Sequence, residues 1–208
     1  LQPRWVKDLD LTIDYYNIEV KQAIQSVGVD VILASCYPTA AGVAPAYCDR
    51  IVRGADGLIR SIADPLSNIG GDHMSGVDFQ LDYTPQTKIG ALGFLANVNY
   101  LGFFDRTLAD GRVINGKGTY DLGLVLPEWK GNFSFSYGKN GWGGTLNVRW
   151  LGGFRECENN ACQQVDTSAP PPRTRDVESY VAADLNVGYK LTHKGGSISN
   201  FAVGVNNL

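Results

Sequence analysis

Apolar and polar residues alternate in seven separate segments of this 208-residue chain, and this alternation limits the possible folds more than any other feature. A period of two residues sends successive side chains to opposite faces of an extended strand. Charged residues are missing from one face of every segment, while the other face holds mainly Asp, Asn, Thr, Ser, Gly, Lys and Arg. The pattern predicts an all-β fold of seven antiparallel strands. The segments are residues 9–15, 77–83, 92–100, 132–137, 145–150, 181–190 and 201–206.

Alternation alone does not separate a soluble β-sandwich from a membrane-spanning β-barrel, because both present one apolar face. Strand length favours the barrel. The third segment can be extended over residues 89–103, whereas strands of soluble proteins usually contain about five or six residues. A tilted strand needs about 9–11 residues to cross a bilayer.

The connections between the segments also favour a barrel. Short links with turn-forming residues follow the second, fourth and sixth segments, and long links follow the first, third and fifth. Transmembrane barrels have short periplasmic turns and long extracellular loops, which is the same division. The short links are residues 85–88, 139–142 and 192–196, and the long links are roughly residues 21–76, 104–129 and 155–179.

The composition narrows the alternatives further. The chain is 44% hydrophobic and only 19% charged, below the roughly 25% charged residues of soluble domains. A net charge of −3 argues against a nucleic-acid partner, because nucleic-acid-binding domains carry a basic stripe. No apolar run has the length of a membrane-spanning helix. Tyrosine and tryptophan near the ends of the apolar faces favour a barrel with aromatic girdles over a secreted β-sandwich lectin or adhesin.

A sheet that spans lipid has to close, because every backbone N–H and C=O must be paired there. Seven strands is an odd number, whereas single-chain bacterial barrels have an even number. We therefore expect residues 1–208 to be a partial, C-terminal region of a larger barrel, with strands before Leu1 and one after Leu208.

The two faces of the strands have different expected environments. The residues predicted to face lipid are Leu11, Ile13, Phe79, Leu81, Phe94, Val98, Phe133, Phe135, Leu146, Val148, Leu185, Val187 and Val203. The residues predicted to face the lumen are Asp14, Asp78, Asp82, Asn97, Asn147, Arg149, Asp184 and Lys190.

Four cysteines lie in the long links as two local pairs, Cys36 with Cys48 and Cys157 with Cys162. Four cysteines allow three disulfide pairings, and the local pairing is the simplest. A shared metal site is disfavoured because only the second pair approaches the spacing of a zinc clamp. Two structural disulfides would indicate an oxidising compartment.

The chain resembles the C-terminal barrel region of TonB-dependent outer-membrane receptors over nearly its whole length. The matching segments are residues 11–20, Cys36-Tyr37, Tyr47-Cys48, residues 75–78, residues 127–130 and, most specifically, Gly-Val-Asn-Asn-Leu at 204–208. The resemblance implies a barrel of about 22 strands closed by a plug domain. The plug, the early strands and the final strand are then expected to lie outside residues 1–208.

The resemblance also implies a function. Such receptors actively import a scarce nutrient (an iron chelate, cobalamin, a carbohydrate or an oligopeptide) across the outer membrane of a Gram-negative bacterium. The expected partners are outer-membrane lipid, the nutrient, and the TonB–ExbB–ExbD complex acting through the plug. The main alternative is a passive porin. We expect no cofactor and no enzymatic activity, since neither His73 nor His193 belongs to a recognisable nucleophile–base motif.

The first long link contains a further candidate element. Within residues 21–37, Ile24, Val27, Val31 and Cys36 have near-helical spacing. The spacing predicts a short helix, tied by a Cys36–Cys48 bridge. A protease-resistant loop is favoured over a loop that closes on substrate. The arginines of the outer links, Arg53, Arg155, Arg173 and Arg175, are interpreted as solvated surface charges rather than as an anion site.

Overall fold

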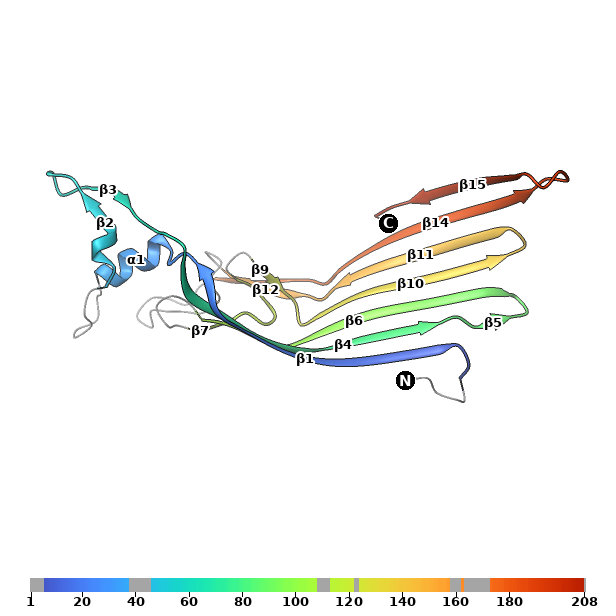
Figure 1. Cartoon of the computed structure of the whole chain (residues 1–208), viewed down its shortest axis with the longest axis horizontal. Coiled ribbons are helices and arrows are strands. Elements are labelled where there is room, and N and C mark those ends of the chain that lie inside the picture. The colour runs from blue at the N-terminus through green and yellow to red at the C-terminus, as the bar shows by residue number, and fades with distance from the viewer. Residues whose placement is uncertain are drawn as a thin grey trace. The chain divides into compact units, whose positions relative to one another are not determined.

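Seven long strands form the main sheet of the computed structural model, which describes residues 6–37, 46–107, 113–121, 124–157, 162 and 173–207. They are β1 (Leu9–Gln25), β4 (Ser67–Tyr83), β6 (Gly90–Thr107), β10 (Trp129–Lys139), β11 (Trp142–Leu151), β14 (Tyr180–Thr192) and β15 (Ile198–Val205). Their order in the sheet is their order in the chain, and β10, β11, β14 and β15 are antiparallel neighbours (Figure 1). The prediction of an all-β fold is confirmed. Two short strands, β5 (Gln86–Thr87) and β7 (Val113–Asn115), also pair with β6, so the main sheet has nine strands among the described residues, and it is not closed.

The chain divides into two compact units, which we describe separately. The sheet unit comprises Leu1–Asn17, Ser75–Phe103 and Gly116–Leu208, and the loop unit comprises Ile18–Met74 and Phe104–Asn115.

An apolar row crosses five strands of the sheet unit. Phe135 lies opposite Phe94 on one side and Leu146 on the other. Leu146 lies opposite Leu185, which lies opposite Val205. Because side chains in register share a face, these residues form one continuous apolar surface.

Polar rows occupy the other face of the same strands. Asn132 lies between Asn97 and Arg149, and Asn147 lies opposite Asp184. A shift of one residue in any strand pair would exchange the two faces. The segregation of the side chains therefore fixes the register.

The short links are tight turns, as predicted. Asn140 and Gly141 both have positive φ, 51° and 85°, the conformation of a two-residue type I′ hairpin. A Cβ at Gly141 would lie 2.6 Å from the carbonyl oxygen of Lys190, so glycine is required there for space as well. The turn between β14 and β15 is closed by a bond from the His193 N–H to the Ser197 carbonyl, 2.9 Å.

The first long link is shorter than predicted. β1 continues to Gln25 and β4 begins at Ser67, so both strands have 17 residues. The alternation changes phase or lapses in these extensions, but the strands continue because their backbone groups are still paired.

The second and third long links join in a small sheet within the sheet unit. Its order is β13 (Thr174–Val177), β12 (Phe154–Cys157), β8 (Thr119–Asp121) and β9 (Leu124–Leu126). β12 and β8 are parallel, and the other two pairs are antiparallel.

The loop unit contains α1 (Val29–Cys36), the 3-10 turn η1 (Cys48–Arg50) and the hairpin of β2 (Ile51–Arg53) and β3 (Ile59–Ile62). Ile32 of α1 is fully buried. The Asp64 carboxylate accepts bonds from the N–H groups of Val27 (2.9 Å) and Gly28 (3.0 Å), which fixes the entry to the helix. The predicted helix exists, but it starts at Val29. Among the described residues, no helix is long and apolar enough to span a membrane.

A two-point ion pair links β4 and β6 in the loop unit. Arg106 Nε lies 2.7 Å from Asp72 Oδ1, and Nη2 lies 2.8 Å from Oδ2. The bond to Asp72 raises the pKa of Arg106, and partial burial only partly opposes it. Because the pKa of Arg106 is raised, the contribution of its charge to stability is fully present at neutral pH and is lost only as the pH rises through the arginine pKa.

We predict that Arg106→Met destabilises the loop unit by about 2 kcal/mol, because a carboxylate with only 18% of its side chain exposed loses its partner. The matched control is Arg60→Met, whose pair with Asp56 is mostly exposed and is expected to contribute less than about 0.5 kcal/mol. Hydrogen exchange of the loop-unit amides measures both. Equal effects of the two substitutions would contradict the prediction.

Candidate functional site

A polar hollow of about 520 Å³ lies on the polar face of the sheet unit. Its polar lining crosses six strands from β1 to β14 and comprises Asp14, Asp78, Gln80, Asn97, Asn99, Lys130, Asn132, Arg149 and Tyr180. The structure thus brings together four of the predicted lumen residues: Asp14, Asp78, Asn97 and Arg149. The other four, Asp82, Asn147, Asp184 and Lys190, do not line the hollow.

Hydrogen bonds order the side chains around this hollow. Asn99 donates to Asp78 (2.6 Å) and to the Tyr16 hydroxyl (3.2 Å). Arg149 pairs with Asp184 at 3.4 Å, and its side chain is 58% exposed. Two carboxylates and two cations line the hollow, so their charges balance.

Asn99 and Lys130 were not among the residues predicted to face the lumen. Asn99 stood on the recognised polar face of its segment, but nothing in the sequence alone placed it beside Asp78. Lys130 precedes the alternating segment at 132–137, and extending the alternation back by two residues would have found it.

The apolar face of the sheet unit is strongly exposed. Phe133, Phe135 and Leu185 are 37–39% exposed, and Val203 is 73% exposed. Nine of the thirteen residues predicted to face lipid share this face by register: Phe94, Val98, Phe133, Phe135, Leu146, Val148, Leu185, Val187 and Val203. The remaining four, Leu11, Ile13, Phe79 and Leu81, lie in β1 and β4, and Leu81 lines an apolar hollow together with Phe94.

Aromatic residues mark both ends of this face. Trp129 and Tyr137 are eight residues apart in β10, and Trp142 and Trp150 are eight residues apart in β11. Eight residues extend about 27 Å along a strand, or about 20 Å in height at a tilt of about 40°. The apolar band of an outer-membrane barrel is about 25 Å tall and is flanked by aromatic girdles.

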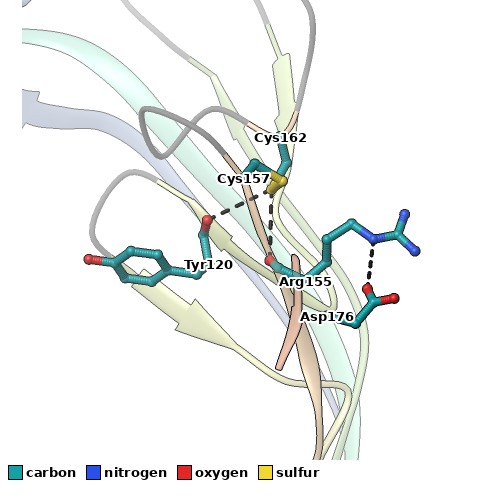
Figure 2. Close-up of polar contacts among 5 residues, drawn as sticks. All are labelled: Tyr120, Arg155, Cys157, Cys162 and Asp176. Atoms are coloured by element: carbon teal, nitrogen blue, oxygen red, sulfur yellow. Dashed lines mark hydrogen bonds and ion pairs between the residues drawn. A yellow bond between two sulfur atoms is a disulfide. The ribbon is translucent and has the colours of Figure 1, made fainter. Parts of the chain in front are cut away.

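Both predicted disulfides are present. Cys36 is bonded to Cys48 between α1 and η1, and Cys157 is bonded to Cys162. Figure 2 shows Cys162 against the small sheet, with its sulfur 3.8 Å from the carbonyl oxygens of Tyr120 and Arg155. A disulfide sulfur has no hydrogen to donate, so these are packing contacts. These contacts pack Cys162, in the third long link, against β8 and β12.

Ion pairs hold the small sheet and its surroundings. Arg155 Nε lies 3.1 Å from Asp176 across the β12–β13 pair (Figure 2), and Arg175 pairs with Glu156. Arg53, in the loop unit, donates to the Tyr37 hydroxyl (2.6 Å) and to the Gly57 carbonyl (2.6 Å). Local partners hold these three arginines, which favours a structural role for their charges over an anion site. Arg173 is also engaged in an interaction.

Lys117 lies at the junction of the small sheet and β6. Its Nζ donates to the Tyr100 hydroxyl (3.3 Å) and lies 3.2 Å from Glu128. Slight burial lowers the pKa of Lys117. The interactions with Tyr100 and Glu128 raise this pKa by more than burial lowers it, so the net shift is upward. Lys117 therefore remains a cation at neutral pH.

Potential metal ligands and the histidine of the last turn are placed as follows. In the described part of the chain, no group of three or more His, Cys, Asp or Glu side chains is placed to hold a metal ion. The His193 ring nitrogen lies 2.9 Å from the Ser199 hydroxyl. His193 is in an exposed turn, which lacks the water-excluded setting in which charge stabilisation accelerates reactions.

Comparison with known proteins gives one match. The model of the family described as TonB dependent receptor-like, beta-barrel matches residues 3–208. No curated protein and no solved structure matches.

Proposed function

Because the chain belongs to the TonB-dependent receptor β-barrel family, we propose that it forms part of the wall of an outer-membrane barrel that actively imports a scarce nutrient. TonB-dependent receptors are transporters of the outer membrane of Gram-negative bacteria. We further propose that the nutrient carried by this receptor is an iron chelate, cobalamin, a carbohydrate or an oligopeptide.

The observation that carries the proposal is the division of one sheet into two chemically different faces. An exposed face that carries Phe94, Phe135, Leu146 and Leu185 in one row is unfavourable in water, because soluble proteins rarely expose continuous apolar patches of more than a few hundred Å². Contact with lipid chains removes this penalty. The opposite, polar face then lines a hydrated interior.

The remaining parts of the receptor are proposed to come from chain beyond residues 1–208. A barrel of about 22 strands has room for a plug domain, and closure pairs the backbone groups at the sheet edges. The plug would receive energy from the TonB–ExbB–ExbD complex. The chain itself is proposed to have no enzymatic role.

Uptake measurements test this function. Cells that lack the gene are supplied in turn with a ferric hydroxamate, cyanocobalamin, a maltooligosaccharide and a short peptide, each in labelled form. We expect uptake of one of these to fall to background, and to fall equally when wild-type cells lose TonB or receive a protonophore. Unchanged uptake of all four would contradict the proposal for these nutrients. Uptake that survives loss of TonB would identify a passive porin.

A further inference from the structure

A groove of about 640 Å³ lies where the apolar face of the sheet unit meets the small sheet of β8, β9, β12 and β13. Two indole rings line it, those of Trp129 and Trp150. Both belong to the apolar face, since Trp129 lies opposite Tyr100 and Trp150 lies opposite Val181. The groove is therefore on the side that we assign to lipid, at the end with the long links.

Glycines lie against both tryptophans. Gly131 lies opposite Trp150, and a Cβ there would come within 3.4 Å of that ring and 2.9 Å of the Phe133 ring. A Cβ at Gly152 would lie 2.8 Å from the carbonyl oxygen of Trp129. A side chain at Gly131 would crowd the Trp150 ring, and one at Gly152 would crowd the Trp129 backbone, so both glycines leave space at this surface.

Polar groups from the small sheet form the opposite wall. Lys117 and Glu128 pair at 3.2 Å, and Arg155 and Asp176 pair at 3.1 Å. The Arg155 and Asp176 side chains are 58% and 81% exposed, so they can exchange water for another hydrogen-bonding partner. The charges of the four groups balance, which leaves no excess cation to attract a phosphate.

Flat aromatic rings beside balanced donors and acceptors suit a sugar. A pyranose ring has an apolar face of C–H groups that packs on an indole, and its hydroxyls both donate and accept hydrogen bonds. Pockets that bind small ligands generally combine apolar walls with a few placed polar groups in this way. A soluble nutrient would enter through the lumen, on the other face of the sheet.

We propose that this groove binds the sugar part of a glycolipid of the outer leaflet, with Trp129 and Trp150 against the sugar rings and the Lys117–Glu128 and Arg155–Asp176 pairs on its hydroxyls. The inference rests on the proposed function, since it requires the apolar face to contact lipid. It assigns a partner to the outer wall of the barrel, separate from the transported nutrient.

The test uses the full-length receptor in phospholipid nanodiscs with and without rough lipopolysaccharide, and native mass spectrometry counts the bound glycolipid. Trp129→Ala and Arg155→Ala are each expected to weaken glycolipid binding by about tenfold or more, as truncation of a central aromatic or arginine contact typically does. The matched control is Trp142→Ala, which removes an indole of the same face at the opposite end of β11. It is expected to leave binding unchanged.

Several outcomes would overturn the proposal. These are unchanged binding by both groove variants, an equal loss with Trp142→Ala, equal competition by phosphatidylglycerol, or equally tight binding of the lipid-free core oligosaccharide. Arg155→Ala keeps the test valid if Trp129→Ala fails to fold. The heat-dependent gel mobility of folded barrels separates the two proposals: if the wild-type receptor never shows it, the barrel assignment fails, and not only the groove assignment.

Discussion

Replacing Leu185 with arginine is expected to destabilise the barrel in a membrane, lowering its free energy of unfolding by about 2–4 kcal/mol. This is the largest effect that we predict for a single substitution. Leu185 lies in the middle of β14, four residues from Tyr189 and four from Val181. Its neighbours in the row are Leu146 and Val205. An arginine there would hold its charge near the bilayer midplane, where its guanidinium loses most of its hydration.

The control for this substitution is Asn147→Arg, which adds the same side chain to the polar face. Asn147 lies opposite Asp184, so the new charge has water and a carboxylate nearby. Urea unfolding of the full-length receptor in lipid vesicles measures both variants. A small effect of Leu185→Arg, or an equal effect of Asn147→Arg, would show that the apolar face does not contact lipid.

Removal of the Cys36–Cys48 disulfide is expected to have the second-largest effect. The bond closes a short segment with a sequence separation of 12, for which the chain-entropy model gives about 3 kcal/mol. A change of that size raises the population of the open loop, and with it the rate of cleavage by a protease, by about two orders of magnitude. Cys36 is buried beside Ile32, so opening also exposes the small core of the loop unit.

Limited proteolysis of the Cys36→Ser/Cys48→Ser double variant measures this effect, and dithiothreitol added to the wild-type protein should reproduce it. The comparison variant is Cys157→Ser/Cys162→Ser. Its sequence separation is 5, and the same model gives about 2 kcal/mol. If neither variant is cut faster than the wild type, the disulfides do not protect these loops.

The strands and their faces were predictable from the sequence because both depend on short-range rules. Alternation identified the seven long strands of the main sheet but not its two short ones, β5 and β7. The residue types Asn140-Gly141 are those that a type I′ turn requires. Both disulfides followed from the simplest local pairing. The resemblance to TonB-dependent receptors agrees with the family match over residues 3–208.

The ends of the strands and the small sheet were not predictable in the same way. Residues 18–25 continue β1 although the alternation of residues 9–15 does not carry through them: residues 18–21 alternate in the opposite phase. The parallel pairing of β8 with β12 joins segments from two different links. No local pattern encodes such contacts between distant segments, so the groove beside Trp129 and Lys117 could be found only in three dimensions.

The order of the strands has a consequence for how the sheet is assembled. Only two residues, Asn140 and Gly141, separate β10 from β11, whereas 41 residues lie between Gln25 and Ser67. Loop-closure entropy makes the longer connection less favourable by about 2–3 kcal/mol before any contact forms. We therefore expect the β10–β11 hairpin to be an early folding nucleus onto which strands add outward, with β1 joining β4 late, after the loop unit has shortened that connection.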